Sequence, residues 1–409
     1  MGKTTYELTP RDVLFFRDAR PMDVDKRKDD VFNVGHGAHW PRPDQLFSAV
    51  IHELVRDPSA PEGAWYGKVK DLRVTGPFPL RNGTLYLPMP LDWDMNLVAF
   101  DVALGTTDIP APLTAGFADR VVEKKSYPKW IPVADYARYL RGEVERGKGP
   151  TKEDEPEKDK PANGDRSLAL CEPRFGTTLD ATTGASKRAD GKTGSGRYAA
   201  EYLRLGKGVT FVCAVETERD AELKDRWVRF GGQGGLVRFE AADDLDARLR
   251  ALPQGTPTRF VRWTLLAPAL FAKGWYPNWL EETVDGTRTG KVMLPMEEVL
   301  RRPGESRAAY RARMNVERRP FETARLIAAC VGKAVAFSGY DSQDREKPTE
   351  LAVPAGASYV FACETVEEAQ KLVAALHLKA RSDLGEKGFG LGVCSYVSEP
   401  EKFTAESNN

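Results

Sequence analysis

The sequence predicts an α+β protein made of two domains. With 409 residues, the chain is longer than an ordinary single domain and long enough for two domains with large insertions. Segments with the period-two alternation of strands are interleaved with segments of helical period. An order of strand, helix, glycine-rich loop and strand occurs twice, so we interpret the chain as two copies of one unit, residues 1–245 and 246–409.

The first domain opens with a strand in YELTPRDVLFFRD (6–18). In PRPDQLFSAVIHELVRD (41–57), apolar residues recur at spacing four after a Pro-Asp start, which predicts an amphipathic helix. Residues 71–90 alternate around the turn signal Asn82-Gly83, and this pattern predicts a hairpin.

A large insertion is expected at about 91–206. Within it, residues 141–166 are almost wholly charged, Pro or Gly, so this loop cannot bury a core and we expect it to be disordered. The domain then ends with a strand at 209–216, a short charged helix around 218–228, the cluster Gly231-Gly232-Gln233-Gly234-Gly235 and a strand at 236–240.

The second domain follows the order β-α-β-β-α-β, which is that of the ferredoxin-like (RRM-like) fold. The expected elements are a strand at 259–271, a helix at 321–332, strands at 333–339 and 358–364, a helix from Val366 to about Lys379, the Gly-rich loop 388–392 and a strand at 392–397. The first domain fits the same order more loosely, because the insertion displaces its second half.

The composition excludes several classes of protein. Hydrophobic residues make up 41% and charged residues 29%, a globular balance, and no apolar run is long enough to span a bilayer. The N-terminus lacks the order of a signal peptide, and the five cysteines form no CxxC pair, so we expect a cytoplasmic protein with reduced thiols and no membrane partner. Lys plus Arg equals Asp plus Glu at 60 each, so an argument for nucleic acid must come from local patches.

The Gly-rich loops are the first candidate site. A loop without side chains lets backbone amides approach a phosphate closely, and Lys387 adds a charge beside the second loop. The alternative is a tight turn in which glycine only ends a helix. Neither loop is a dinucleotide-binding motif, because the helix precedes the loop instead of following it.

Arginines near aromatic residues are the second signal, since their planes stack bases of single-stranded RNA. They occur at Arg17, Arg20, Trp40 and Arg42, and an aromatic cluster follows in Trp275, Tyr276 and Trp279. Core packing is the alternative for the tryptophans. The polar stretch 184–197 adds Lys187, Arg188 and Arg197.

The hypothesis that the chain is a nuclease rests on His36 and His39, which lie near Gly35 and Gly37 in the sequence. A histidine in a flexible basic loop can abstract a 2′-OH proton. We favour RNA contact or packing for both. No spacing of His or Cys indicates a metal site, and we expect neither a metal nor a cofactor.

Together these segments resemble the Cas5-like RAMP (repeat-associated mysterious protein) subunit of the type III-B CRISPR (Cmr) effector complex. The matching segments, in the right order, are TPRDVLFFRDARPMD (9–23), WPRPDQLFSAVIHEL (40–54), CEPRFGTTLDATTGAS (171–186), GRYAAEYLRL (196–205), WVRFGGQGGLVRF (227–239), LLAPALFAKGWYP (265–277), AVPAGASYVF (352–361) and GFGLGVCSYV (388–397). Gln233 and Gly235 depart from the family's Gly-Gly-Glu-Gly-Arg motif, whereas the backbone glycines of the loop remain.

The resemblance implies two ferredoxin-like domains and a non-catalytic subunit. Such a subunit caps the 5′ end of the guide RNA (crRNA), holds its repeat-derived tag, and contacts the large polymerase/cyclase-like subunit and the first backbone subunit. Target RNA would be met only indirectly. The residues expected to contact RNA are Lys387, Gly388, Phe389, Gly390, Leu391, Gly392, Gly231, Gly232, Gln233, Gly234, Arg17, Arg20, His39, Trp40, Arg42, Arg174, Lys187, Arg188 and Arg197.

Two alternatives remain open at this point. One is a metal-independent endoribonuclease of the same superfamily that processes CRISPR repeat RNA with His36 or His39 as base. The other is a protein-only scaffold subunit in which the glycine loops merely turn the chain.

Overall fold

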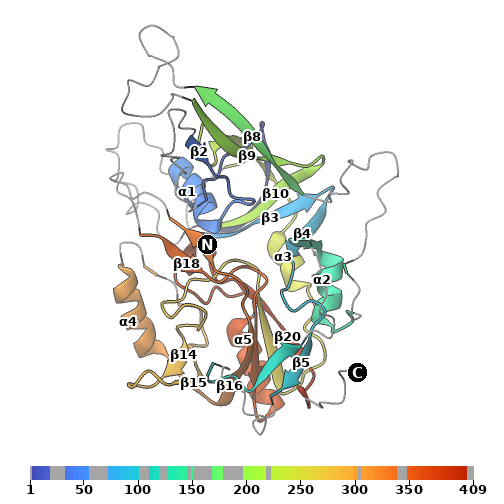
Figure 1. Ribbon diagram of the computed structural model, residues 1–409, viewed down its shortest axis with the longest axis vertical. Helices are drawn as coiled ribbons and strands as arrows, with labels where there is room; N and C mark the ends of the chain where they lie inside the picture. Colours follow the sequence, from blue (N-terminus) through green and yellow to red (C-terminus); the bar gives the residue numbers. More distant parts are fainter. Residues whose placement is uncertain are drawn as a thin grey trace, which may run out of the picture. The chain divides into compact units, whose positions relative to one another are not determined.

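The computed structural model (Figure 1) describes most of the chain. The described residues are 2–18, 33–54, 72–100, 110–118, 128–144, 149–150, 168–177, 197–217, 223–299, 301–302, 305–338 and 348–402. In this part of the chain, no helix is long and apolar enough to cross a membrane.

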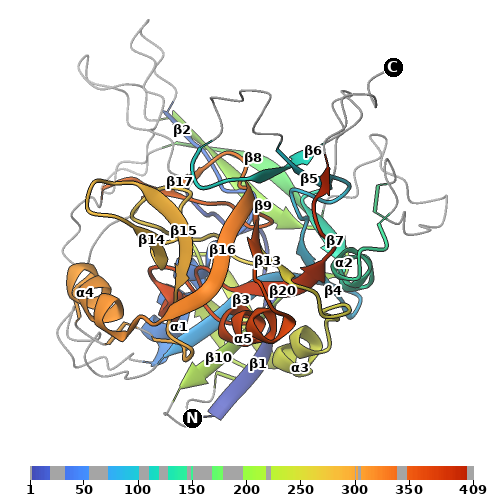
Figure 2. The same cartoon turned by 90° about the horizontal axis from the view of Figure 1, so that it is seen from below.

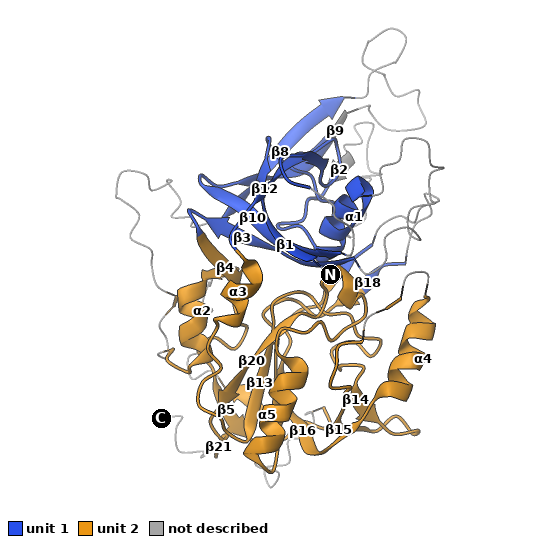
Figure 3. Cartoon of the chain, turned by 180° about the vertical axis from the view of Figure 1, so that it is seen from behind, with its two compact units in different colours: residues 1–83, 166–243, 336–350 blue, residues 84–165, 244–335, 351–409 orange. Residues whose placement is uncertain are grey.

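The chain forms two compact units, coloured separately in Figure 3. Unit 1 comprises residues 1–83, 166–243 and 336–350, and unit 2 comprises 84–165, 244–335 and 351–409. The chain passes from unit 1 to unit 2 between residues 243 and 244, next to the domain boundary that the sequence predicted between residues 245 and 246. The segment 84–165, assigned from the sequence to the first domain, groups with unit 2 instead.

Unit 1 is a mainly antiparallel α+β unit. Its strands run in the order β11-β12-β1-β10-β3, and β2, β9 and β8 form a second small sheet. Its elements are β1 (Gly2–Pro10), β2 (Asn33–Gly35), α1 (Pro43–Leu54), β3 (Arg73–Arg81), β8 (Ala169–Thr177), β9 (Arg197–Leu205), β10 (Val209–Thr217), β11 (Trp227–Arg229) and β12 (Leu236–Ala241).

Helix α1 forms because its apolar residues fall on one face. Leu46 and Val50 are fully buried and pack with Leu8 and Phe211 of the sheet. At the start of the helix, the Arg42 amide donates to the Gln45 side chain (2.8 Å).

Unit 2 contains a larger antiparallel sheet in the order β14-β15-β16-β19-β13-β20. Its elements are β4 (Thr84–Pro88), β5 (Asn96–Ala99), β6 (Ala115–Ala118), β7 (Trp130–Pro132), α2 (Val133–Leu140), α3 (Leu245–Arg250), β13 (Phe260–Leu265), β14 (Leu280–Glu282), β15 (Arg288–Met293), α4 (Arg307–Glu317), β16 (Pro320–Cys330), β19 (Ser358–Ala362), α5 (Val366–Leu376), a 3-10 turn (Gly385–Lys387), β20 (Gly392–Val397) and β21 (Glu401–Lys402). Two short strands, β17 (Val335–Phe337) and β18 (Glu350–Ala352), lie where the chain passes between units.

One face of the unit 2 sheet is covered by α5, as Figure 2 shows. The core beneath this helix contains Trp263, Tyr359 and Phe361, all fully buried. The helix starts with Thr365 as its N-cap, because the Thr365 hydroxyl accepts from the Glu368 amide (3.2 Å).

The opposite face of this sheet carries a buried ion pair. The side chains of Arg262, Thr264 and Ser358 alternate with the core residues and point to this face. Asp92, which is 1% exposed, accepts from Ser358 (2.6 Å), Tyr139 (2.7 Å) and Arg262 (3.3 Å), and the Arg262 guanidinium lies 3.8 Å from the Tyr139 ring centroid. Helix α2 and the segment around Asp92 therefore cover this face of the sheet.

In each unit, four antiparallel strands follow the order 4-1-3-2 when numbered along the chain. These are β12-β1-β10-β3 in unit 1 and β20-β13-β19-β16 in unit 2. The predicted α+β class is confirmed as a mixed, strand-rich architecture with few helices. The predicted helices at 41–57 and 366–379 are confirmed as α1 and α5.

Two predicted helices are wrong in the described residues. Residues 321–332 form most of strand β16, because their backbone pairs with β15 and β19, and this pairing overrides the helical spacing of the apolar residues. The helix before that strand is α4. Within 218–228, residues 223–226 form turns and 227–229 form β11, so the first Gly-rich loop joins two strands of a hairpin instead of a helix and a strand.

Candidate nucleic-acid interface

Several predicted residues of unit 1 meet around the segment 14–18. Leu14 exchanges two backbone hydrogen bonds with Leu203 of β9 (2.9 and 2.7 Å), and the Gly232 amide donates to the Phe15 carbonyl (2.8 Å). The side chain of Arg17 is exposed, and its backbone forms an antiparallel β-bridge with Gly37. We call residues 12–18, 35–39, 171–177, 201–204 and 231–235 the tip cluster.

Aromatic rings and a guanidinium form one wall of the tip cluster. The rings of Phe15 and Tyr202 lie 5.4 Å apart, and the Arg174 guanidinium lies 5.4 Å from the Tyr202 ring centroid. Phe175, on the next position of β8, is 74% exposed. Stacked rings and an arginine plane of this kind suit the bases of a single-stranded RNA.

An ion-pair network lies beside these rings. Arg174 and Arg204 both donate to Glu172 (2.9 Å from Arg174 Nε, 3.1 Å from Arg204 Nη2), and both also reach Asp12 (3.0 and 3.3 Å). Hydrogen bonds from Arg204 and then Arg174 lower the pKa of Glu172 to about 2. The two guanidinium groups, which a phosphate could use, are thus held by carboxylates when no RNA is bound.

The first Gly-rich loop is an exposed hairpin turn. Residues 231–234 are exposed, and Gly231, Gln233 and Gly234 all have positive φ (81°, 56° and 73°). A side chain at Gly231 would meet the Phe15 carbonyl, so glycine is required for the close approach of the turn to that segment. Within the described residues, no acceptor takes the amide hydrogens of Gln233 and Gly234, which leaves both open to a phosphate or sugar.

The two histidines of the nuclease reading differ in their surroundings. His36 Nδ1 lies 3.4 Å from the Glu201 carboxylate, which also accepts from the Gly37 amide (3.1 Å). His39 is exposed. A carboxylate beside an imidazole can orient it as a base, so the pair retains a chemical basis for that reading.

Trp40 and Arg42 are held inside unit 1. The Trp40 indole donates to the Pro77 carbonyl (2.9 Å), and its ring packs on Phe211 (4.9 Å), so core packing describes this residue. Arg42 pairs with Asp44 at the start of α1 (3.0 Å). RNA contact by either side chain would require breaking these interactions.

The second Gly-rich loop lies in unit 2 and is buried. Residues 388–392 have buried positions throughout, and the amides of Gly388 and Gly390 donate to the carbonyls of Gly385 (2.9 Å) and Pro268 (2.8 Å). An RNA phosphate could take these amides only by displacing those acceptors. The arrangement matches the alternative of a tight turn.

Packing explains the glycine at the end of this loop. A side chain at Gly392 would collide with the indole of Trp263, and Phe389 is fully buried. Lys387, which ends the 3-10 turn, is half-buried.

For the remaining residues that were predicted to contact RNA, the structure describes either nothing or the backbone alone. Arg20, Lys187 and Arg188 lie outside them, as does most of the charged loop 141–166. Arg197 is described only through its backbone, which pairs with Thr177.

Sequence reasoning missed Phe15, Tyr202 and Arg204. Tyr202 pairs with Glu172 across the β8–β9 ladder, so residues two apart on these strands share one face. The period-two pattern Ala200, Tyr202, Arg204 could have identified that face.

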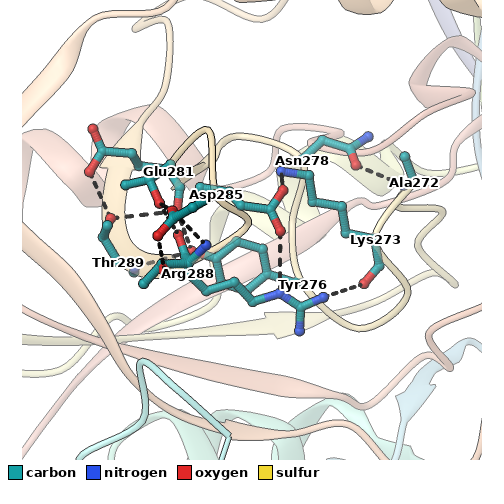
Figure 4. Close-up of polar contacts among 12 residues, drawn as sticks. Ala272, Lys273, Tyr276, Asn278, Glu281, Asp285, Arg288 and Thr289 are labelled. Atoms are coloured by element: carbon teal, nitrogen blue, oxygen red, sulfur yellow. Dashed lines mark hydrogen bonds and ion pairs between the residues drawn. The ribbon is translucent and has the colours of Figure 1, made fainter.

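The aromatic cluster of unit 2 is a core feature stabilised by polar contacts (Figure 4). Tyr276 and Trp279 are buried, and the Arg288 guanidinium lies 4.9 Å from the Tyr276 ring centroid. The Tyr276 hydroxyl donates to the Glu281 carbonyl (2.8 Å) and accepts from the Gly290 amide (3.1 Å). Core packing, the alternative weighed from the sequence, thus describes Tyr276 and Trp279.

A family model matches nearly the whole chain. Residues 6–396 match the family model "CRISPR-associated protein (Cas_Cmr3)". No curated protein matches the sequence.

Solved structures with a similar chain come from CRISPR complexes. A chain in the cryo-EM structure of the Type III-B Cmr-beta bound to cognate target RNA and AMPPnP is 15% identical, with a TM-score of 0.43, over 87% of this chain and 86% of that chain. A chain of the Csm3-Csm4 subcomplex in the type III-A CRISPR-Cas interference complex is 12% identical, with a TM-score of 0.36, over 89% of this chain and 93% of that chain. At this level of similarity, we rest the family assignment on the sequence match alone.

Proposed function

Because the chain belongs to the Cas_Cmr3 family of CRISPR-associated proteins, RAMP subunits of type III effector complexes, we propose that it caps the 5′ end of the guide RNA and holds its repeat-derived tag. The resemblance noted in the sequence is confirmed by this family match. In the proposed role, the chain bridges the large polymerase/cyclase-like subunit and the first backbone subunit in the cytoplasm. Its two units would both be ferredoxin-like domains, which the shared strand order supports.

The tip cluster is the observation that carries the RNA-binding part of this proposal. It combines exposed Arg17 with the open amides of Gln233 and Gly234 and the stacked pair Phe15–Tyr202. These are the groups that hold a phosphate backbone and stack unpaired bases. In unit 2, by contrast, helices and a buried ion pair occupy both sheet faces, so RNA would meet that unit at loops and edges.

The test is reconstitution of the effector complex with a chain in which Arg17 and Arg174 are both replaced by alanine. Losing two phosphate or base contacts should weaken guide-RNA retention by about 10- to 100-fold and make its salt dependence shallower. Arg141→Ala, an exposed arginine of unit 2 paired with Glu143, is the matched control and should retain the RNA. Equal retention by all three proteins would exclude the tip cluster as the RNA site and favour the protein-only scaffold.

The endoribonuclease alternative rests on the pair His36–Glu201 (3.4 Å). We propose that the chain is not catalytic and that this pair fixes the loop around Gly37, whose amide shares the same carboxylate. Incubating the purified chain with repeat RNA in EDTA should give no cleavage. Specific cleavage that disappears in His36→Ala or His39→Ala would establish the nuclease instead.

A further inference from the structure

The β11–β12–β1 end of the unit 1 sheet packs one of its faces against the core. On these strands the core residues are Val228, Phe239 and Leu8, each at most 2% exposed. Side chains alternate along a strand, so the residues between these point to the opposite face. The register of the two strand pairs therefore decides which side chains meet on that opposite face.

A patch of four residues lies on the opposite face, at the end of the sheet next to the first Gly-rich loop. Arg229 of β11 pairs with Leu236 of β12. The Arg11 amide, one residue beyond β1, donates to the Leu236 carbonyl (3.0 Å), so these three residues form one row across the sheet. Trp227 shares this face, two residues before Arg229 and about 7 Å from it along the strand. We call Arg11, Trp227, Arg229 and Leu236 the outer patch.

Both arginines of the outer patch lack a partner. The side chains of Arg11 and Arg229 are exposed, and neither guanidinium makes an ion pair or a hydrogen bond within the described part of the chain. The neighbouring Arg238, by contrast, is neutralised by Asp225 (3.1 Å). Two unpaired guanidinium groups on one row create a local positive charge in a chain whose net charge is zero.

Trp227 places an aromatic ring beside these cations. It is 48% exposed, and its indole N–H donates to no residue that the structure describes. A single exposed aromatic residue is ordinary on a protein surface, but here unpaired arginines accompany it. A flat ring next to guanidinium groups is the arrangement that stacks an unpaired base and holds the adjoining phosphates.

The outer patch is continuous with the loop 231–235. Strand β11 ends at Arg229, and the loop begins two residues later. Within the loop, the amides of Gln233 and Gly234 are open to a ligand. Strand and loop thus present, in order along the chain, an aromatic ring, a cation and two open amides. Each of these groups suits one part of a nucleotide chain.

The charge of the outer face changes along the strands. Glu7 of β1 and Glu240 of β12 face each other one row beyond Arg238. A polyanion is therefore attracted to the row of Arg11 and Arg229 and repelled further along the sheet. The attractive end is the one that adjoins the loop.

We propose that the guide RNA continues from the tip cluster onto the outer patch, where Trp227 stacks one base and Arg229 and Arg11 hold the neighbouring phosphates. The inference rests on the proposed RNA-binding function and extends the bound strand beyond the loop. It assigns the patch to unpaired RNA, because bases within a duplex are already stacked on one another. An acidic protein segment would meet the same arginines but would leave the ring without a planar partner.

Fluorescence anisotropy of labelled guide RNA with the purified full chain, at several salt concentrations, tests the proposal. Trp227→Ala should weaken binding by about 5- to 100-fold at an unchanged salt slope, because stacking releases no counterions. Trp227→Phe keeps a flat ring and should bind nearly as the parent does. The double variant Arg11→Ala/Arg229→Ala should make the slope of log K against log salt less negative by about 1.4. Arg226→Ala is the matched control, since this exposed arginine pairs with Glu53 of α1 instead (3.4 Å).

All variants should melt at the temperature of the parent, because the replaced side chains are exposed. Parent-like binding by Trp227→Ala and the double variant, with weak binding by Arg17→Ala/Arg174→Ala, would overturn the inference and leave the proposed function intact. Unchanged binding in every variant would overturn both. A loss of the same size in Arg226→Ala would reduce the effect to bulk charge and overturn the inference. Loss of a partner subunit in pull-downs without RNA, at unchanged RNA affinity, would assign the patch to a protein interface instead.

Discussion

Replacing Glu172 with glutamine should strengthen RNA binding. In the free chain, the Glu172 carboxylate accepts from both Arg174 (2.9 Å) and Arg204 (3.1 Å). Since these hydrogen bonds lower its pKa to about 2, the group is ionised at every pH used for binding. A phosphate that enters the tip cluster must therefore compete with it for two guanidinium groups. Glutamine keeps the size of the side chain and removes the charge.

The expected magnitude follows from the two arginines that lose the Glu172 carboxylate and keep only Asp12 as an acidic partner. Each additional phosphate contact makes the slope of log K against log salt more negative by about 0.7 for a single strand, so two contacts give about 1.4. Exposed ion pairs of this kind are individually weak, so the gain in affinity at low salt should be about 3- to 30-fold.

Fluorescence anisotropy with labelled guide RNA, at several salt concentrations, measures both quantities. Glu143→Gln is the matched control, because it removes the same charge and releases an exposed arginine, Arg141, outside the tip cluster. An affinity and slope unchanged in Glu172→Gln would refute phosphate binding at these arginines. Equal gains in both variants would show that only net charge matters.

Three further predictions concern stability. Burial lowers the pKa of His377 from 6.5 to about 4, so between these pH values the unfolded chain binds more protons than the folded chain. The free energy of unfolding should therefore fall by about 3 kcal/mol as the pH drops from 6.5 to 4. Urea titrations at several pH values measure this fall, and the variant His377→Gln should not show it. Asp92→Asn leaves a buried guanidinium unpaired and should lower the unfolding free energy by about 3–5 kcal/mol; a loss below about 1 kcal/mol would contradict the pairing. Gly392→Ala should lower the melting temperature through its collision with Trp263, by more than Gly2→Ala, whose added methyl meets only open space without a positive φ. Equal shifts would argue against a packing role for the second loop.

Local sequence patterns predicted the elements whose packing depends on one apolar face. Helices α1 and α5 and strands β13, β19 and β20 all carry a clear period, and their burial follows it. Strand β16 escaped prediction because its apolar spacing resembles a helix and only pairing with β19 decides otherwise. The buried pair Asp92–Arg262 joins residues far apart in the chain, so no local window contains it.

The sequence indicated which types of residue a nucleic-acid site would use, but it did not indicate which of the two Gly-rich loops is exposed. Arg17, Arg174 and the turn at 231–234 all lie in the tip cluster of unit 1, and their contact with RNA stays a prediction. The loop at 388–392 has the same glycine content but is buried, because Pro268, more than a hundred residues earlier, supplies the acceptor for its amide. Glycine content alone therefore cannot distinguish a loop open to ligand from a packed one.

The sheet of unit 2 is covered on one side by α5 and on the other by the Asp92 network. Segments that merely connect its strands, such as the exposed turn at 283–287, add little to this doubly covered core. We therefore expect that this turn can be replaced by that of a related protein while the sheet stays folded. A chimera that carries the 283–287 turn of a related protein should keep the melting temperature of this chain, and any change in its binding should come from the replaced turn.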